Sequence, residues 1–233
     1  MTTAGLLREL MHRTALDGSF TARNIVTPSG GRRRGLYPSR FGMLPYEAPL
    51  ECDLIKRLDG SWTCTEFVTQ ALQLLIRDRR ADQESFRYTP DACVRHHGGR
   101  ISLIECKPDD LLDEFNRPRG PKIQRYLQSL DIDFLVLTES ELHPGLRQAN
   151  ASMLSCNFRR ALKPALVRQL QERTTKAQPS TFGALAHALG LGDARTALAR
   201  GFVFFDTAAL LTESTPIHPT FHEALDAADF LCA

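Results

Sequence analysis

The amino-acid sequence predicts an α/β domain followed by a helical domain that ends in a helix-and-hairpin module. Two observations lead to this prediction. Between residues 46 and 143, segments with helical spacing of apolar residues alternate with short runs rich in apolar and β-branched residues. From residue 146 onward, helical patterns dominate. A length of 233 residues with 42% apolar residues is sufficient for a core in each domain.

The elements of the α/β domain are predicted in the order helix, three strands, helix and strand. The first helix begins at Pro49 and ends at Gly60, because proline suits the first helical turn and glycine suits the position after the last. The three strands are predicted over residues 66–78, 86–96 and 100–107, with a tight turn at residues 97–99. A polar connection over residues 109–120 precedes a helix over 120–130 and a strand over 131–138.

The C-terminal part predicts two arginine-bearing helices over residues 146–176, the second of which begins at Pro164. Residues 178–216 predict the order helix, turn, helix, strand, turn, strand, which is the order of a small winged-helix module. Thr181 or Ser180 is the expected cap of its first helix. We therefore expect a basic arm and two domains, over residues 1–45, 46–143 and 144–233.

The net charge of +2 is the sum of unequal parts. Residues 1–45 carry seven basic and two acidic groups, residues 46–143 carry 13 and 18, and residues 144–233 carry nine and seven. The arm contains an arginine cluster of candidate DNA contacts, namely Arg32, Arg33, Arg34 and Arg40. The alternative is a solvated linker without a partner.

The acidic middle of the chain contains Asp91 after Pro90, and Glu105 and Lys107 in the third predicted strand. Because strand side chains alternate between faces, Glu105 and Lys107 should point the same way. If the second and third strands form a hairpin, Asp91 lies near Glu105. Carboxylate oxygens suit Mg²⁺ or Mn²⁺, and such an ion polarises a phosphodiester and lowers the pKa of bound water.

Two further side chains could belong to this site. Glu51 in the first helix would be a third carboxylate, and Gln70 in the first strand could orient Lys107 or a water molecule. Lys107 could offset negative charge in the transition state. Structural alternatives stay open, since Asp91 could be a turn residue, Glu105 and Lys107 an exposed ion pair, and Glu51 a favourable charge near a helix N-terminus.

The order of a helical Glu, PD and ExK resembles the signature of restriction-endonuclease-like nucleases, whose core has the order αβββαβ. The longer set of FRYTPD, LIECK and ALARGFVFFDTAALLTESTPI resembles the TnsA family, the endonuclease subunit of heteromeric transposases. This resemblance implies that Glu51, Asp91 and Glu105 coordinate one or two Mg²⁺ (or Mn²⁺) ions, that Lys107 is catalytic and that Gln70 supports them.

The resemblance also implies the substrate and the partners. The substrate would be double-stranded DNA at transposon ends, cut at the 5′ ends, and the partners a TnsB-like transposase and a TnsC-like ATPase. The alternatives are a stand-alone restriction, repair or junction-resolving nuclease of the same fold, or an inactive DNA-binding scaffold.

Other classes are disfavoured by missing patterns. There is no apolar run long enough to span a bilayer and no signal peptide, so a cytoplasmic, nucleoid-associated protein is expected. The order of Cys93, His96, His97 and Cys106 fits no standard zinc spacing. Phosphate-binding glycine motifs and the G-x-S-x-G motif are absent from the sequence, which disfavours nucleotide-dependent and serine-hydrolase chemistry.

Overall fold

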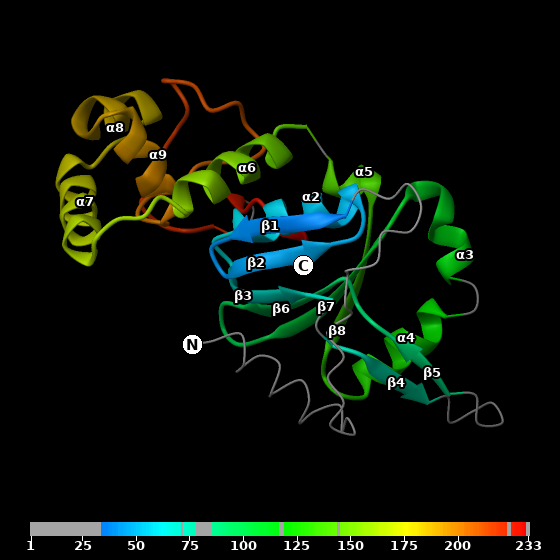
Figure 1. Ribbon diagram of the computed structural model, residues 1–233. Coiled ribbons are helices and arrows are strands. Elements are labelled where there is room, and N and C mark those ends of the chain that lie inside the picture. The colour runs from blue at the N-terminus through cyan, green and yellow to red at the C-terminus, as the bar shows by residue number, and fades with distance from the viewer. Residues whose placement is uncertain are drawn as a thin grey trace. The chain divides into compact units, whose positions relative to one another are not determined.

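The structure is a computed structural model that describes residues 34–70, 72–77, 85–116, 119–143, 145–222 and 225–231 (Figure 1). The chain forms two compact units. The first contains Met1–Leu54 and Thr65–Leu142, and the second contains Ile55–Cys64 and His143–Ala233. The first unit is a mixed sheet with helices, and the second is mainly helical, so the predicted fold class is confirmed at this level.

A four-stranded sheet with the order β3-β6-β7-β8 forms the centre of the first unit. Its strands are β3 (Cys64–Thr69), β6 (Ala92–His96), β7 (Ile101–Lys107) and β8 (Asp133–Thr138). β6 and β7 are antiparallel, whereas β8 runs parallel to β7. The parallel pair is joined through α4 (Gly120–Gln128), and α5 (Glu139–Leu142) follows β8. The strands predicted over residues 100–107 and 131–138 and the helix predicted over 120–130 are thereby confirmed.

Two of the predicted strands are each divided in two. The segment 66–78 forms β3 and β4 (Leu74–Arg77), because Gln70 adopts a left-handed backbone with a φ of 48° that ends the first strand. The segment 86–96 forms β5 (Ser85–Tyr88) and β6, separated at residues 89–91. β4 and β5 pair with each other as a separate antiparallel hairpin. The prediction of two long strands was therefore wrong.

Two regions predicted as irregular are ordered. The predicted polar connection contains η1 (Asp109–Leu111) and α3 (Leu112–Asn116). The described part of the predicted arm forms an antiparallel hairpin of β1 (Gly35–Ser39) and β2 (Gly42–Tyr46). Phe41 in its turn packs edge-on against the buried Phe67 of β3, with ring centroids 5.2 Å apart. This packing explains why a glycine- and proline-rich segment is ordered here.

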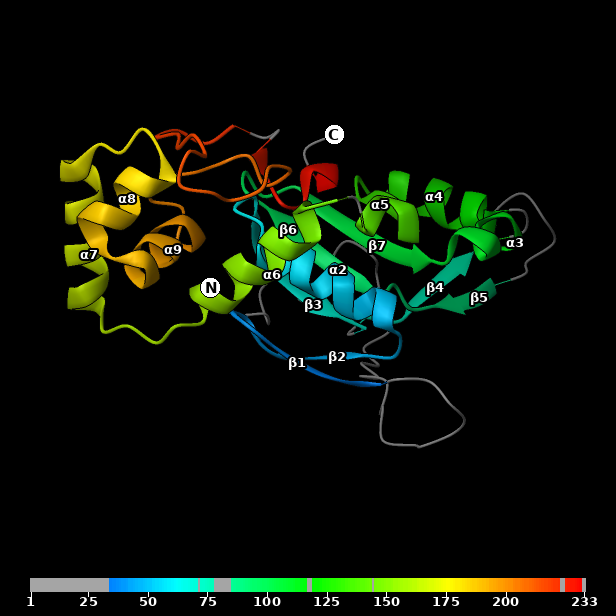
Figure 2. The same ribbon diagram turned by 90° about the horizontal axis from the view of Figure 1, so that it is seen from above.

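The two faces of the sheet are covered by different elements. On one face, α4 contributes Ile123 and Leu127 to a core that also contains Val68 of β3 and Leu103 of β7. The β1–β2 hairpin lies on the other side of the sheet (Figure 2), where Phe67, the neighbour of Val68, meets it. Alternation along β7 therefore places Ile101, Leu103, Glu105 and Lys107 on the face that α4 covers.

In its described residues, the second unit has four main helices around a core of leucine, alanine and phenylalanine side chains. They are α6 (Arg147–Phe158), α7 (Pro164–Ala177), α8 (Phe182–Leu189) and α9 (Leu191–Ala199). The predicted helices are confirmed, and the Thr181 side chain caps α8 by accepting a hydrogen bond from Ala184 N at 3.2 Å.

The two strands predicted after α9 are not formed. Phe204 and His218 make an isolated antiparallel bridge in their place. Pro216 and Pro219 flank His218 at a distance of one or two residues and carry no N–H to extend a ladder. The second unit thus has the helices of the predicted winged-helix module without strands for its wing.

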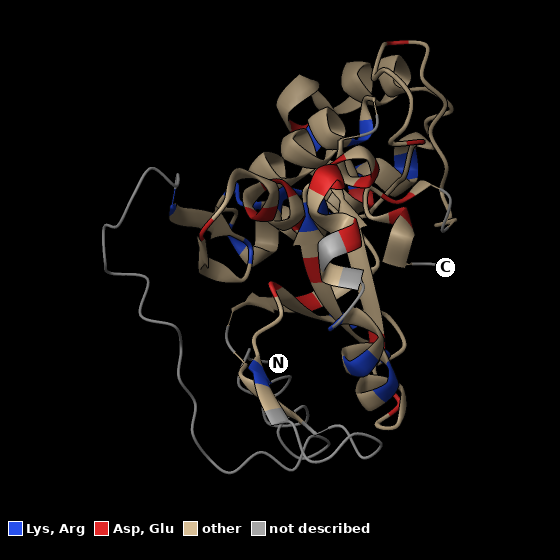
Figure 3. Cartoon of the chain, turned by 90° about the vertical axis from the view of Figure 1, so that its right-hand side faces the viewer, with Lys and Arg blue, Asp and Glu red and all other residues tan. Residues whose placement is uncertain are grey.

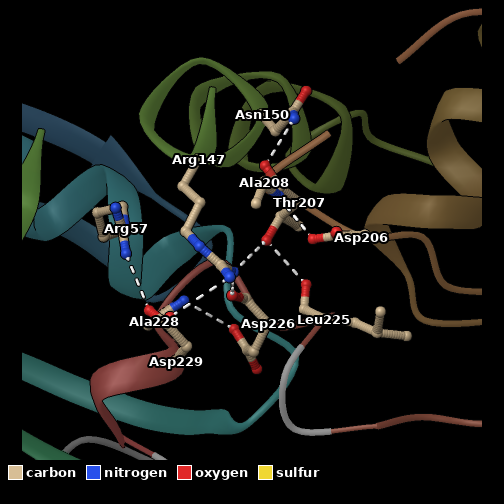
Figure 4. A network of polar contacts seen from close by, with 10 residues as sticks. All are labelled: Arg57, Arg147, Asn150, Asp206, Thr207, Ala208, Leu225, Asp226, Ala228 and Asp229. Atoms are coloured by element: carbon tan, nitrogen blue, oxygen red, sulfur yellow. Dashed lines mark hydrogen bonds and ion pairs between the residues drawn. The ribbon is translucent and has the colours of Figure 1, made fainter. Parts of the chain in front are cut away.

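The helix α2 (Pro49–Asp59) is predicted correctly, and its residues are divided between the units after Leu54. Within the second unit, the Arg57 guanidinium is fully buried and pairs with Asp229 at 3.3 Å (Figure 4). Burial lowers the pKa of Arg57 to about 10, an effect that Asp229 opposes. Asp229 opens the short helix η3 (Asp229–Leu231), so this ion pair fixes the C-terminal segment.

Further polar contacts hold the same segment. Arg147 pairs with Asp229 at 3.4 Å and donates to the Asp226 carbonyl oxygen at 2.8 Å. The buried Asp226 carboxylate accepts hydrogen bonds from the backbone N–H groups of Thr63 at 2.7 Å and Ala228 at 2.9 Å. Ordering of residues 225–231 therefore depends on charged groups distant in the sequence. Separately, none of the helices in the described residues is long and apolar enough to cross a membrane.

We expect Asp229→Asn to lower the free energy of unfolding by about 1–3 kcal/mol, because Arg57 would lose a carboxylate partner while remaining buried. Urea denaturation followed by circular dichroism measures this change. The double variant Arg57→Met, Asp229→Asn should cost less than the sum of the two single variants. Additive effects would show that the ion pair does not stabilise this segment.

Candidate active site

The pairing of β6 with β7 brings Asp91 and Glu105 together. The register joins Ala92 to Ile104, so Asp91, which immediately precedes β6, lies opposite Glu105. The Asp91 Oδ2 atom accepts a hydrogen bond from the backbone N–H of Cys106 at 2.7 Å. Directly opposite residues of an antiparallel pair have Cβ atoms about 4.5–5.5 Å apart. The two acidic side chains that the sequence singled out are therefore neighbours.

Glu105 is held by one side chain of its own strand and one of β5. The residue is only 6% exposed. Oε2 accepts a hydrogen bond from the Tyr88 hydroxyl at 2.8 Å, and Oε1 accepts one from Lys107 Nζ at 2.5 Å. Lys107 thus lies on the same face as Glu105, as the alternation along a strand predicts. The carboxylate and the ammonium form one unit near the end of β7.

Lys107 also contacts an aromatic ring. Its Nζ lies 5.1 Å from the centroid of the Phe115 ring, an arrangement that favours a cation. Burial lowers the pKa of Lys107, but the adjacent Glu105 outweighs this effect and the pKa is raised. The side chain therefore remains an ammonium ion at neutral pH.

Glu51 and Gln70 form a second pair at this site. Glu51 lies in the first turn of α2, and its Oε2 accepts hydrogen bonds from Glu47 N at 2.8 Å and from Gln70 Nε2 at 2.7 Å. Gln70 follows the last residue of β3 and is 4% exposed. Its Oε1 is buried and has no hydrogen-bond partner among the described residues. An unsatisfied buried oxygen is costly, so it marks a position where a further polar group would be stabilising.

The three carboxylates destabilise one another when ionised. Burial, and then the charges of Glu105 and Glu51, raise the pKa of Asp91 well above its ordinary value. Burial is also the main cause that raises the pKa of Glu51, and the charge of Glu47 and, to a smaller extent, that of Glu105 add to it. Repulsion between buried like charges persists in a fold only where other contacts enforce it, and it is common at functional sites.

The residues fit a divalent cation that uses few protein ligands. Within the described residues, no three His, Cys, Asp or Glu side chains converge on a single point suited to a metal ion. Mg²⁺, however, is usually held by one or two carboxylates, with waters and substrate phosphates completing the shell. Asp91 and Glu105 supply two carboxylates of this kind. The Oδ1 atom of Asp91 makes no hydrogen bond with the described residues. A cation there would also offset the repulsion between the carboxylates.

The structure describes two of the four candidate DNA-binding arginines. Arg32 and Arg33 lie outside the described residues. Arg34 precedes β1 and Arg40 follows it, so the five residues of β1 lie between them. The Arg40 guanidinium lies 4.7 Å from the centroid of the Phe41 ring.

Tyr88 and Phe115 are site residues that the sequence analysis missed. Tyr88 comes two residues before Pro90, and an aromatic hydroxyl in a buried strand needs a polar partner, which was an available signal. Phe115 lies in the segment predicted as a polar connection. Only the chain path through α3 brings its ring to Lys107, so no local pattern could have identified it.

We expect Asp91→Asn to raise the thermal midpoint in the absence of divalent metal, because it removes one of the mutually repelling charges while its side-chain oxygen can still accept from Cys106 N. The same variant should lose stabilisation by Mn²⁺, which for the wild type would reach about 2.7 kcal/mol at 100 times the dissociation constant. Differential scanning fluorimetry with a Mn²⁺ titration measures both effects. Asp110→Asn, a change at an exposed acid of η1, is the matched control, and a full Mn²⁺ shift in Asp91→Asn would contradict the assignment.

Comparisons with known proteins leave the family open. No protein-family model matches the chain, and no curated protein sequence matches it significantly. The family resemblance in its motifs therefore enters only as a proposal, and the geometry described above is the main basis for assigning a function.

Proposed function

We propose that this chain is a metal-dependent DNA endonuclease with a restriction-endonuclease-like core. The observation that carries the proposal is the juxtaposition of Asp91, Glu105 and Lys107 where β6 begins and β7 ends, on one face of the sheet. Two carboxylates that can coordinate a metal ion, beside an ammonium ion, suit metal-assisted hydrolysis of a phosphodiester.

The order of the elements supports this proposal. Helix α2 is followed by β3, β6 and β7 of the central sheet, and then by α4 and β8. This is an αβββαβ order once the β4–β5 hairpin is treated as an insertion between β3 and β6. The acidic residues lie in and beside the two central strands, where the resemblance of the PD and ExK motifs predicts them.

Asp91 and Glu105 would hold one or two Mg²⁺ or Mn²⁺ ions, with Glu51 as a third carboxylate. When bound, the metal would polarise the phosphodiester and lower the pKa of a water molecule. The Lys107 ammonium would donate a hydrogen bond to an anionic phosphate oxygen and offset the charge that develops there. Tyr88 and Phe115 would fix the directions of Glu105 and Lys107, respectively.

Gln70 has a positioning role in this scheme. Its amide nitrogen holds Glu51, and its buried Oε1 would accept a hydrogen bond from a water molecule at the site. The left-handed backbone at this non-glycine residue is a strained conformation that directs the side chain toward Glu51.

The finer assignment is the TnsA-like subunit of a cut-and-paste transposase. It would cut at the 5′ ends of a transposon, with a TnsB-like transposase and a TnsC-like ATPase as partners. The motif resemblance supports this assignment, including the segment after α9, although that segment lacks the predicted wing strands. A stand-alone nuclease of the same fold would cut without those partners, and an inactive scaffold would not cut.

A nicking assay on supercoiled plasmid DNA that carries transposon ends, with the partner transposase and ATPase present, tests the reaction. With Mg²⁺ or Mn²⁺ we expect nicking by the wild type, and a loss of about 10²–10³-fold or more in each of Asp91→Ala, Glu105→Gln and Lys107→Ala, comparable to losing one transition-state contact in other enzymes. EDTA should abolish the activity, and Asp110→Asn should retain it. Unchanged nicking by Asp91→Ala and Glu105→Gln would overturn the site assignment.

The dependence on partners tests the finer assignment. A TnsA-like subunit should cut end-containing DNA only in the presence of its partner transposase and ATPase. Metal-dependent cutting by the isolated chain at a defined sequence or a branched junction would favour a stand-alone nuclease. Absence of cutting under both conditions, with DNA binding retained, would favour a scaffold.

A further inference from the structure

Helix α4 has a basic side without acidic residues, on which Arg119 and Arg125 are exposed and Lys122 is half-buried. Arg119 precedes the helix, and Lys122 and Arg125 follow at intervals of three residues, so the three lie along one flank. We call these three residues the α4 basic face. The exposed amide of Gln128 adjoins it, three residues after Arg125, and no Asp or Glu occurs between residues 119 and 130. Figure 3 accordingly draws α4 with blue segments and no red ones.

Two of these charges have no ion-pair partner among the residues that the structure describes. Neither Arg119 nor Arg125 forms an ion pair with the described residues, whereas Arg95 and Arg100 of the same unit pair with Glu66 at 3.4 Å and Asp133 at 3.3 Å. The fold thus pairs some of its basic groups with acidic ones, but leaves Arg119 and Arg125 exposed and without an acidic partner in the described part of the chain. Exposed positive side chains attract polyanions.

The topology places the α4 basic face beside the candidate active site. A helix that connects two parallel strands runs antiparallel to them, so the N-terminus of α4 lies at the end of the sheet where β7 finishes with Glu105 and Lys107. Ile123 and Leu127 pack in one cluster with Ile101 and Leu103, which confirms that α4 covers the face carrying both site residues.

A chain of contacts leads from the first basic residue to the site. The Arg119 guanidinium lies 5.8 Å from the centroid of the Phe86 ring. Phe86 and Tyr88 are on the same side of β5, about 7 Å apart along the strand. The Tyr88 hydroxyl donates to Glu105. Arg119 is therefore separated from the candidate active site by only two aromatic side chains.

We propose that the α4 basic face binds the sugar-phosphate backbone of the DNA duplex next to the bond that is cut. This inference rests on the proposed function. A phosphodiester held at Glu105 and Lys107 belongs to a continuous strand, and its neighbouring phosphates meet the positive flank of α4. Arginine and lysine bind phosphate oxygens, and an amide side chain such as that of Gln128 donates to them as well. The contact is independent of base sequence and positions the duplex.

The test compares two triple variants of the full chain that remove equal charge. The first is Arg119→Gln, Lys122→Gln, Arg125→Gln on the α4 basic face. The second is Lys163→Gln, Arg168→Gln, Lys176→Gln, which changes exposed residues at α7 in the other unit. Fluorescence anisotropy with a labelled duplex of arbitrary sequence, in EDTA so that no cutting occurs, gives the dissociation constant across about 50–200 mM salt. Circular dichroism checks that both variants are folded.

The α4 variant should bind the duplex at least about tenfold more weakly than wild type, and its salt slope should fall by about 2–3, since each lost phosphate contact contributes about 0.9. The α7 variant should change both quantities much less. Equal weakening in both variants would overturn the proposal, because net charge alone would then explain binding, and so would unchanged binding in the α4 variant. A wild type that binds the duplex but cuts DNA neither alone nor with the partner transposase and ATPase would instead contradict the proposed function, so the two failures are distinguishable.

Discussion

The antiparallel pairing of β6 and β7 is the constraint on which the candidate site depends. Its register sets Asp91 opposite Glu105, and the hydrogen bond from Cys106 N to Asp91 fixes the carboxylate beyond the strand end. A shift of the register by one residue would move the side chains of one strand to the other face. The tight turn at residues 97–99, in which Gly98 and Gly99 have positive φ angles, helps to fix this register.

The fold maintains a concentration of acidic groups that is unfavourable by itself. Tyr88, Lys107 and Gln70 each satisfy one carboxylate oxygen, yet the pKa values of Asp91 and Glu51 remain raised because burial and mutual repulsion are only partly offset. Apolar packing of Leu103, Ile123 and their neighbours supplies the stability that holds these groups in place. A divalent cation would remove the residual repulsion, which connects the electrostatics of the structure to the proposed chemistry.

Several elements were predictable from local sequence patterns, and others were not. Pro49 and Gly60 marked the ends of α2 correctly, and the β-branched and apolar run of β7 identified the strand that carries Glu105 and Lys107. The division at Gln70 was missed because the apolar pattern resumes at Leu72 and Leu74 and hides the change of pairing partner. The division at residues 89–91 had a local signal, since Pro90 cannot donate to a strand ladder. Tyr88 and Phe115 reach the site through tertiary packing. The position of the α4 basic face beside the candidate active site can be recognised only once the strand order is known. The two strands predicted after α9 did not form. Pro216 and Pro219 carry no N–H group that could extend the pairing beyond the single bridge of Phe204 and His218.

The most direct test of this account is a crystal structure grown with Mn²⁺ and recorded at a wavelength where manganese scatters anomalously. The account predicts an anomalous peak between the carboxylates of Asp91 and Glu105, at about 2.0–2.6 Å from an oxygen of each. A well-ordered site without a peak at saturating Mn²⁺, or with a peak bound only by other side chains, would contradict it.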